Sequence, residues 1–307
     1  MGIILLFNGC NRGAAGAAAT DASASGELSF IVMGDWGRGG KFSQQDIADQ
    51  MEKTAAQSKS AFVLSMGDNF YEDGVQSVND PQWQSSFENI YTGEHLQKKW
   101  YVVLGNHDYR GDPQAEVEYT KKSNRWMMPD RYYTFVQKVD RKNSVRFVII
   151  DSSPFYNTYH KEPGKYHTIL EQDTLKQLHY IDSVLAQSTE KWKIVLGHHP
   201  VFSASDHEAT PEFTKALKPI LEKRKAQFYL SGHDHSLQHI QPATGGVDYV
   251  VSGSGSQATG KIVKQDIVKF GSSTPGFALM SIKGDTATTS YIDAKGSVLY
   301  SFKKSSH

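Results

Sequence analysis

Five short segments of this sequence repeat one design, and together they constrain the fold more than any other feature. In each, an apolar run ends in glycine and is followed at once by Asp, Asn or His. The segments are Gly34-Asp35-Trp36-Gly37, Gly67-Asp68-Asn69-Phe70-Tyr71, Gly105-Asn106-His107-Asp108, Gly197-His198-His199-Pro200 and Gly232-His233-Asp234-His235. Such runs predict buried strands, and glycine lets the chain turn sharply where a strand ends. We therefore expect the polar side chains at the carboxyl edge of a sheet, where ligands bind in open α/β folds.

The hydrophobic periodicity alternates between strand and helix over the first 110 residues, which predicts a mostly parallel sheet. We predict strands over residues 28–34, 61–67, 100–105, 132–139, 145–151, 192–196 and 228–230, and helices over 41–58, 82–91, 171–188 and 211–225. The third helix should bury a stripe of Leu175, Leu178, Ile181, Val184 and Leu185, and the fourth should begin with Thr210 as N-cap and Pro211. Strand-like runs follow Asp248. These patterns predict an α/β fold of two sheets packed face to face, with helices outside.

The first 26 residues differ in composition from the rest. Residues 3–7 are apolar, Cys10 follows, and a Gly/Ala/Ser-rich stretch extends to Gly26. This pattern is typical of a bacterial lipoprotein signal followed by a flexible tether, although no Lys or Arg precedes the apolar run. The alternative is a tail in which Cys10 has no role. We predict one folded domain over residues 27–307, exported to the periplasm or cell surface, with membrane attachment through a lipidated Cys10.

Charge and cysteine content exclude several functions. Lys plus Arg equals Asp plus Glu, at 33 each, so no net basic field is available to hold nucleic acid. Cys10 is the only cysteine, which excludes both a disulfide framework and a zinc site built from thiolates.

The five segments carry the residue types that bind metals. Asp, Asn and His supply the oxygen and nitrogen ligands preferred by hard and borderline ions. In an extended Gly-His-Asp-His, His233 and His235 point to the same side, as a metal pair requires. Each segment alone has a simpler explanation, such as a turn, a helix cap or a surface histidine cluster. All five in this order favour a site in which two metals hold a phosphoryl group.

Together the five segments resemble the motif set of the metallophosphoesterases. Tyr71, three residues after Asp68, narrows the resemblance to the purple acid phosphatases, and within them to the small, tartrate-resistant type. The similarity extends from about Phe30 to Ile292 and includes Asn124-Arg125-Trp126. It implies a four-layer αββα sandwich, with two mixed sheets flanked by helices.

The resemblance also implies a set of metal ligands. Asp35, Tyr71 and His235 would hold Fe(III), and Asp68 would bridge both metals. Asn106, His198 and His233 would hold a divalent ion, which is Fe(II), Zn(II) or Mn(II) in the family. Two carboxylates and a phenolate suit the trivalent ion, and the neutral side chains suit the divalent one.

Other residues of the segments are assigned supporting roles. His107 should reach the phosphate or the leaving oxygen as a general acid, with Asp108 fixing its orientation. His207 matches a second active-site histidine of the family, or is a loop histidine without a role. We expect His199 and Asp234 to be spacers, and Trp36 and Phe70 to form a wall or core.

The resemblance implies an acid phosphatase that hydrolyses phosphate monoesters by attack of a metal-activated hydroxide. Small phosphate monoesters, phosphopeptides and nucleotides are the expected substrates, and the protein is expected to be a monomer. Two rivals stay open: a phosphodiesterase or nucleotidase with two divalent metals, and an exported lipoprotein that binds metal or phosphate without turnover. The intact ligand set argues against the second. Residues 152–166, aromatic and interrupted by Pro and Gly, are either a loop that shapes substrate access or a surface loop without a role.

Overall fold

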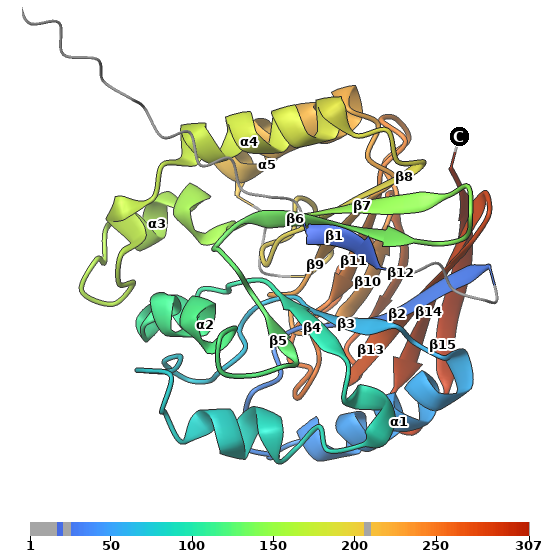
Figure 1. The fold of residues 1–307 in the computed structure, drawn as a ribbon. Coiled ribbons are helices and arrows are strands. Elements are labelled where there is room, and N and C mark those ends of the chain that lie inside the picture. The colour runs from blue at the N-terminus through green and yellow to red at the C-terminus, as the bar shows by residue number, and fades with distance from the viewer. Residues whose placement is uncertain (1–16, 21–25, 206–209, 307) are drawn as a thin grey trace, which may run out of the picture.

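The structure, a computed structural model, describes residues 17–20, 26–205 and 210–306. Two β-sheets lie face to face between layers of helices (Figure 1). The first sheet has the order β15-β14-β13-β2-β3-β4-β5. Its strands are β2 (Glu27–Met33), β3 (Phe62–Ser65), β4 (Lys99–Val102), β5 (Trp126–Met127), β13 (Gly276–Lys283), β14 (Thr286–Asp293) and β15 (Val298–Ser305). Strands β2 to β5 run parallel. Strand β13 pairs antiparallel with β2, and β14 and β15 extend the sheet in further antiparallel pairs.

The second sheet has the order β1-β6-β7-β8-β9-β11-β10-β12. Its strands are β1 (Ala17–Thr20), β6 (Tyr133–Lys138), β7 (Ser144–Ile149), β8 (Trp192–Leu196), β9 (Phe228–Ser231), β10 (Leu237–Ile240), β11 (Asp248–Ser252) and β12 (Val268–Ser272). Strands β7, β8, β9 and β11 are parallel. Strand β6 pairs antiparallel with β7 and parallel with β1, and β10 pairs antiparallel with both β11 and β12. Both sheets are therefore mixed, as the resemblance implied.

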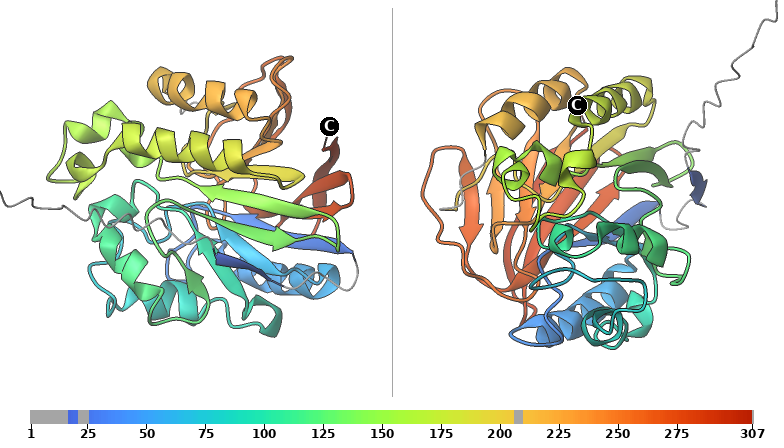
Figure 2. Two further views of the ribbon diagram at one scale, coloured as in Figure 1. Left: turned by 45° about the horizontal axis from the view of Figure 1, so that its top comes forward. Right: turned by 90° about the vertical axis from the view of Figure 1, so that its left-hand side faces the viewer.

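Helices cover the outer face of each sheet (Figure 2). Helix α1 (Gln44–Ser58) packs on the first sheet, whereas α4 (Thr174–Gln187) and α5 (Pro211–Lys223) cover the second. Two short helices, α2 (Pro113–Tyr119) and α3 (Asn157–His160), lie near the edge where the parallel strands end. The predicted four-layer sandwich is confirmed.

Two apolar cores hold the layers together. The larger core lies between the sheets and extends beneath α1, and it includes Phe30, Phe62, Phe147 and Phe277. The smaller core joins the second sheet to α4 and α5 through residues such as Ile181, Leu217 and Tyr229. Because strands in the middle of both sheets are buried on both faces, they read as continuous apolar runs in the sequence.

Most predicted elements are present, and three details differ. Residues 82–91 form only a π-helical turn, Trp83–Glu88, instead of a full helix. Leu175 is 69% exposed, because it lies in the first turn of α4, and only Ile181 and Leu185 of the predicted stripe are fully buried. Thr210 is the N-cap residue of α5, but its side chain makes no capping hydrogen bond.

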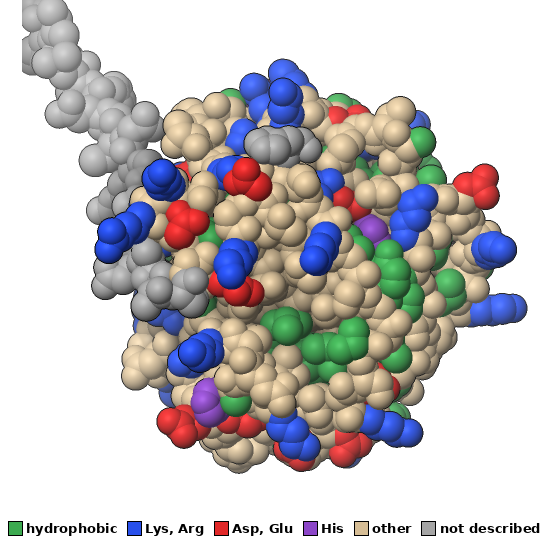
Figure 3. Space-filling model, turned by 90° about the vertical axis from the view of Figure 1, so that its right-hand side faces the viewer, with side chains coloured by type: hydrophobic (Ala, Val, Ile, Leu, Met, Phe, Trp, Pro, Cys, Tyr) green, Lys and Arg blue, Asp and Glu red, His purple; other side chains and the backbone are tan. Residues whose placement is uncertain are grey.

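Of the N-terminal segment, the structure describes residue 26 and residues 17–20, which form β1 beside β6 although the sequence placed them in a tether. Cys10 and the apolar run lie outside the described residues. Within the described part of the chain, no helix has the length and apolar character needed to cross a membrane. On the face that carries β14 and β15, acidic and basic side chains are interspersed around an apolar patch (Figure 3).

Candidate metal centre

The five segments meet at one edge of the sandwich. Three of them follow β2, β3 and β4 of the first sheet, and two follow β8 and β9 of the second. Backbone hydrogen bonds tie neighbouring segments together, from Asp35 N to Gly67 O (3.0 Å) and from Gly232 N to His198 O (2.9 Å). The two sheets are linked directly, because the backbone N–H of His233 donates to Asp35 Oδ2 at 2.9 Å. The expected convergence at the strand ends is therefore present.

One half of the site is rich in oxygen. The Tyr71 hydroxyl lies 3.1 Å from Asp35 Oδ1, 3.0 Å from Asp68 Oδ2 and 2.8 Å from His235 Nε2. Asp35 and Asp68 are buried, and His235 is only partly exposed. We call Asp35, Tyr71 and His235 the oxygen-rich group.

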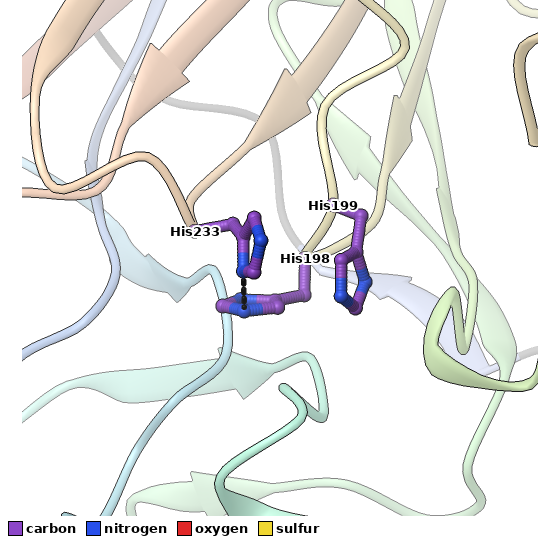
Figure 4. A group of neighbouring side chains, drawn as sticks. All are labelled: His198, His199 and His233. Atoms are coloured by element: carbon purple, nitrogen blue, oxygen red, sulfur yellow. Dashed lines mark hydrogen bonds between the residues drawn. The ribbon is translucent and has the colours of Figure 1, made fainter. Parts of the chain in front are cut away.

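The other half is rich in nitrogen. His198 Nε2 lies 3.2 Å from Asn106 Oδ1 and 3.1 Å from His233 Nδ1 (Figure 4). Its Nδ1 is held by the carbonyl of Met66 at 2.8 Å, which leaves Nε2 directed at its neighbours. We call Asn106, His198 and His233 the nitrogen-rich group.

Asp68 faces both groups. Its Oδ2 contacts Tyr71, while its Oδ1 lies 3.4 Å from His198 Nε2. Burial raises the pKa of Asp68, but the surrounding imidazoles of His198, His107 and His233 outweigh that effect and hold its pKa well below the usual range. The position between the two groups is the one expected for a bridging carboxylate.

The chemistry of the donors fits two different ions. Burial, together with the carboxylates of Asp35 and Asp68, raises the pKa of Tyr71 well above its usual value. A phenolate at this position therefore needs a cation to replace the proton, and a hard trivalent ion suits a phenolate beside two carboxylates. Two imidazoles and an amide oxygen suit a borderline divalent ion. The residues present thus fit the implied dinuclear centre.

The backbone at the site is strained. Asp35 (φ 63°), Asp68 (49°), His233 (70°) and His235 (39°) lie in the left-handed region, which non-glycine residues rarely adopt. They are half of the eight such residues in the described chain. Conformations of this kind persist where the surrounding structure enforces them, and they concentrate at functional sites.

Glycines allow the close approach that the sequence suggested. A Cβ on Gly67, which has φ 90°, would lie 2.6 Å from His198 Nδ1. A Cβ on Gly105 would lie 2.2 Å from the Asp68 carboxylate. Side chains at these positions would displace the ligand groups. The glycines are therefore needed for the space that they leave as well as for the turns that they allow.

His107 lies at the mouth of the site. Its ring centroid is 4.4 Å from that of Tyr71, and its Nε2 lies 3.9 Å from Asp68 Oδ2. Nδ1 pairs with the backbone carbonyl of Glu72 at 2.5 Å. A carbonyl can only accept, so Nδ1 carries a proton and Nε2 is the nitrogen that can exchange one.

Asp108 has a different role from the one expected. It does not orient His107, because its carboxylate accepts from the backbone N–H groups of Asn69 (2.9 Å), Phe70 (3.2 Å) and Gly105 (2.7 Å). The Glu72 carbonyl holds the His107 ring instead. Asp108 therefore fixes the segment of Asp68 against that of Asn106.

His199 is more than a spacer. Its ring lies 4.5 Å from that of His233, and the ligand atoms of His198, His199 and His233 lie within 4.8 Å of one another. However, Nδ1 pairs with Ser152 Oγ at 2.8 Å and Nε2 with the Tyr159 hydroxyl at 2.9 Å. Burial and the two neighbouring histidines lower the pKa of His199 well below its usual value. It is a neutral residue that anchors segment 152–166, which gives that segment a structural link to the site.

Three further expectations concern neighbouring residues. Asp234 points away from the groups, since its carboxylate accepts from Ser203 Oγ (2.6 Å) and Gln238 Nε2 (3.0 Å). His207 lies outside the described residues. Trp36 and Phe70 are fully buried and pack edge to face, so they form the expected core beneath the site.

Sequence reasoning missed one supporting segment. Gly253-Ser254-Gly255-Ser256 follows β11, and the Ser256 hydroxyl donates to the Asp35 carbonyl at 2.7 Å. A Cβ on Gly253 would lie 2.9 Å from Asp35 Oδ2. The signal was available, because this segment has the same strand-then-glycine design, but it lacks an Asp, Asn or His.

Comparison with known proteins identifies this arrangement. A family model described as calcineurin-like phosphoesterase matches residues 28–237, which contain all five segments. The chain therefore belongs to the calcineurin-like phosphoesterases.

Similar proteins define the group more closely. Purple acid phosphatase 7 of Arabidopsis thaliana is 39% identical over 287 residues, which cover 90% of this chain and 85% of that protein. Tartrate-resistant acid phosphatase type 5 of Homo sapiens is 33% identical over 293 residues, or 89% of each chain. Within its family, the chain belongs to the purple acid phosphatases.

A solved structure is also similar. GAP50, described as the anchor in the inner membrane complex of Plasmodium, matches with a TM-score of 0.80 and 26% identity. The match covers 91% of this chain and 89% of that one.

Proposed function

We propose that the protein is an acid phosphatase that hydrolyses phosphate monoesters at a dinuclear centre, with Fe(III) in the oxygen-rich group and a divalent ion, Fe(II), Zn(II) or Mn(II), in the nitrogen-rich group. The observation that carries this proposal is the position of Asp68, whose two oxygens face the two groups separately. Its pKa is held low, so it is ionised and available to bridge two cations. The acid phosphatases among the relatives support the same reaction.

Two bound ions would supply Lewis acidity toward the phosphate oxygens and toward the attacking water. The protein's own groups do the rest. The Glu72 carbonyl keeps a proton on His107 Nδ1, so Nε2 is the atom that protonates the leaving oxygen. We propose His207 as a second residue for this step, on the resemblance alone. Small phosphate monoesters, including phosphopeptides and nucleotides, are the proposed substrates.

The visible absorption spectrum of the oxidised protein tests the metal assignment. We expect a charge-transfer band in the wild type that is absent from Tyr71→Phe, because phenolate-to-iron charge transfer requires the tyrosinate. A colourless wild type that retains two equivalents of zinc or manganese would contradict the ferric assignment. The rates of hydrolysis of p-nitrophenyl phosphate and of bis(p-nitrophenyl) phosphate would then be compared. Faster hydrolysis of the diester would favour the alternative of a phosphodiesterase with two divalent metals.

A second candidate function is supported by the similarity to GAP50. An exported protein of this fold could serve as an anchor without turnover, and Cys10 would attach it to the membrane. The seven candidate ligands are all present in this chain, which favours the enzyme. Release of phosphate by the wild type but not by a variant that lacks a metal ligand would exclude the hypothesis of a non-catalytic anchor. Incorporation of a radioactive fatty acid into the wild type but not into Cys10→Ser would support membrane attachment through Cys10.

A further inference from the structure

Arg38 lies against the ring of Tyr71. The central carbon of its guanidinium group is 3.6 Å from the Tyr71 ring centroid and 5.6 Å from that of Phe42. The first distance is well within the range of about 6 Å in which a cation interacts with an aromatic face. The Arg38 side chain is only 10% exposed, so water screens this contact little.

The position of Arg38 is fixed by bonds on several sides. Its backbone N–H donates to Gln44 Oε1 at 2.9 Å, and its Nη1 donates to Glu72 Oε1 at 2.6 Å. The backbone N–H of Tyr71 donates to Gly37 O at 2.9 Å, which joins the two segments directly. The fold therefore fixes the position of the guanidinium group relative to the phenol ring.

Hydrogen bonding alone does not account for this placement. Nε of Arg38 is buried and has no hydrogen-bond partner among the described residues. A buried donor without a partner costs free energy, so hydrogen bonding at Nε does not explain why the guanidinium group lies over the Tyr71 ring. Arginine is suited to such a position because its planar cation stacks on aromatic faces and is weakly hydrated.

We propose that Arg38 tunes the metal centre through Tyr71: it weakens electron donation from the tyrosinate and so sets the energy of the charge-transfer band and the reduction potential of the ferric ion. This inference rests on the proposed ferric site, in which Tyr71 is a ligand. A cation near the ring stabilises the donor electrons of the phenolate, which raises the energy needed to move one to the metal. The same positive charge favours the less positive, reduced ion.

Three variants test the proposal on metal-loaded protein. Arg38→Gln removes the positive charge together with the guanidinium group. Arg38→Lys keeps the positive charge but has no planar group to stack on the Tyr71 ring. Arg110→Gln is the matched control. Arg110 also lies beside Glu72, with Nη1 3.3 Å from the Glu72 carbonyl, but its guanidinium group lies over the ring of Tyr166, at 5.9 Å.

We expect the band of Arg38→Gln to move to longer wavelength, with Arg38→Lys between it and the wild type. In a redox titration, the ratio of reduced to oxidised protein at a fixed potential should fall about tenfold in Arg38→Gln, the size expected for a partly desolvated cation–π contact. The ratio should change by less than about threefold in Arg110→Gln, because its charge is farther from the Tyr71 ring. Circular dichroism and metal content show that each variant is folded and loaded.

Each outcome decides between the two proposals. A coloured wild type whose band and potential do not move in folded Arg38→Gln would overturn the role of Arg38 and leave the proposed function standing. Equal shifts in Arg110→Gln and Arg38→Gln would also overturn it, because they would show a general charge effect. A colourless wild type would overturn the ferric assignment and this inference with it.

Discussion

Two buried carboxylates in adjacent segments, Asp68 and Asp108, show opposite behaviour. Asp68 is surrounded by imidazoles, and its pKa is held well below the usual range in spite of burial. Asp108 is surrounded by backbone amides, and burial, together with the negative charge of Asp68, raises its pKa to about 7. The first is kept charged to receive cations, whereas the second is shielded and organises the backbone.

The same contrast extends to the residues around them. Burial and neighbouring Asp108 raise the pKa of Glu116 well above its usual value, and burial raises that of Asp151 to about 6. We call Asp108, Glu116 and Asp151 the supporting acids. Negative charge is therefore concentrated where the metals would bind and suppressed among the supporting acids.

The largest effect should come from removing one ligand of the nitrogen-rich group. In His233→Asn we expect kcat/KM for p-nitrophenyl phosphate to fall at least about 10³-fold, a loss of ~4 kcal/mol of transition-state stabilisation. His95→Asn is the control, because His95 pairs with Glu52 and belongs to none of the five segments. Metal analysis should show that the variant loses the divalent ion. Wild-type rates in His233→Asn would contradict the ligand assignment.

An intermediate effect is expected from Asp108→Asn. The amide would place an NH₂ group against N–H donors that Asp108 now satisfies, leaving buried donors unpaired at a cost of about 1–3 kcal/mol of unfolding free energy. Because the segments of Asp68 and Asn106 would shift apart, metal affinity should fall roughly 10–100-fold. Asp112→Asn, at the N-cap of α2, is the matched control, since Asn also caps well.

Metal affinity distinguishes this role from the one the sequence suggested. If Asp108 oriented His107, the variant would bind metal normally and lose activity only through proton transfer. A normal metal affinity with an altered pH profile would therefore contradict the backbone role of Asp108.

The sequence predicted the layers and the convergence of the ligand-type side chains because both depend on local patterns. Buried strands read as apolar runs, and glycine followed by ligand-type residues marks their ends. All seven predicted ligands lie together. What the pattern could not show was the direction of side chains that lie between ligands. Asp108 follows His107 directly, yet it bonds to amides of a different segment, and such contacts depend on how segments distant in sequence pack.

Contacts over long sequence separations explain the other misses. His199 pairs with Ser152 and Tyr159, and Arg38 with the ring of Tyr71, 33 positions away in the sequence. None of these three contacts has a spacing that periodicity would reveal. Leu175 lies on the predicted helical stripe, but it is exposed because it stands in the first turn of α4. The hydrophobic pattern does not show which part of a helix the neighbouring sheet covers.

The smallest effect on activity should come from Asp151, which belongs to the supporting acids but touches no predicted ligand by hydrogen bond. Its carboxylate accepts from the Tyr109 hydroxyl, which in turn accepts from Arg131 at 2.9 Å. Since its pKa is raised from 3.8 to about 6, the folded protein holds a proton that the unfolded chain has released. Stability from this group therefore falls as pH rises from about 4 to about 6, by ~3 kcal/mol in total.

Asp151→Asn removes that titration and keeps an acceptor for Tyr109. Urea unfolding of wild type and variant at pH 4 and pH 7 should show the variant gaining about 3 kcal/mol relative to wild type at the higher pH, with activity changed only a few-fold. Taking the difference between the two proteins cancels the titration of the metal ligands, which they share. Parallel stability curves would show that Asp151 is ionised in the folded state. The contrast between charged ligands and shielded supporting acids would then be limited to Asp108 and Glu116.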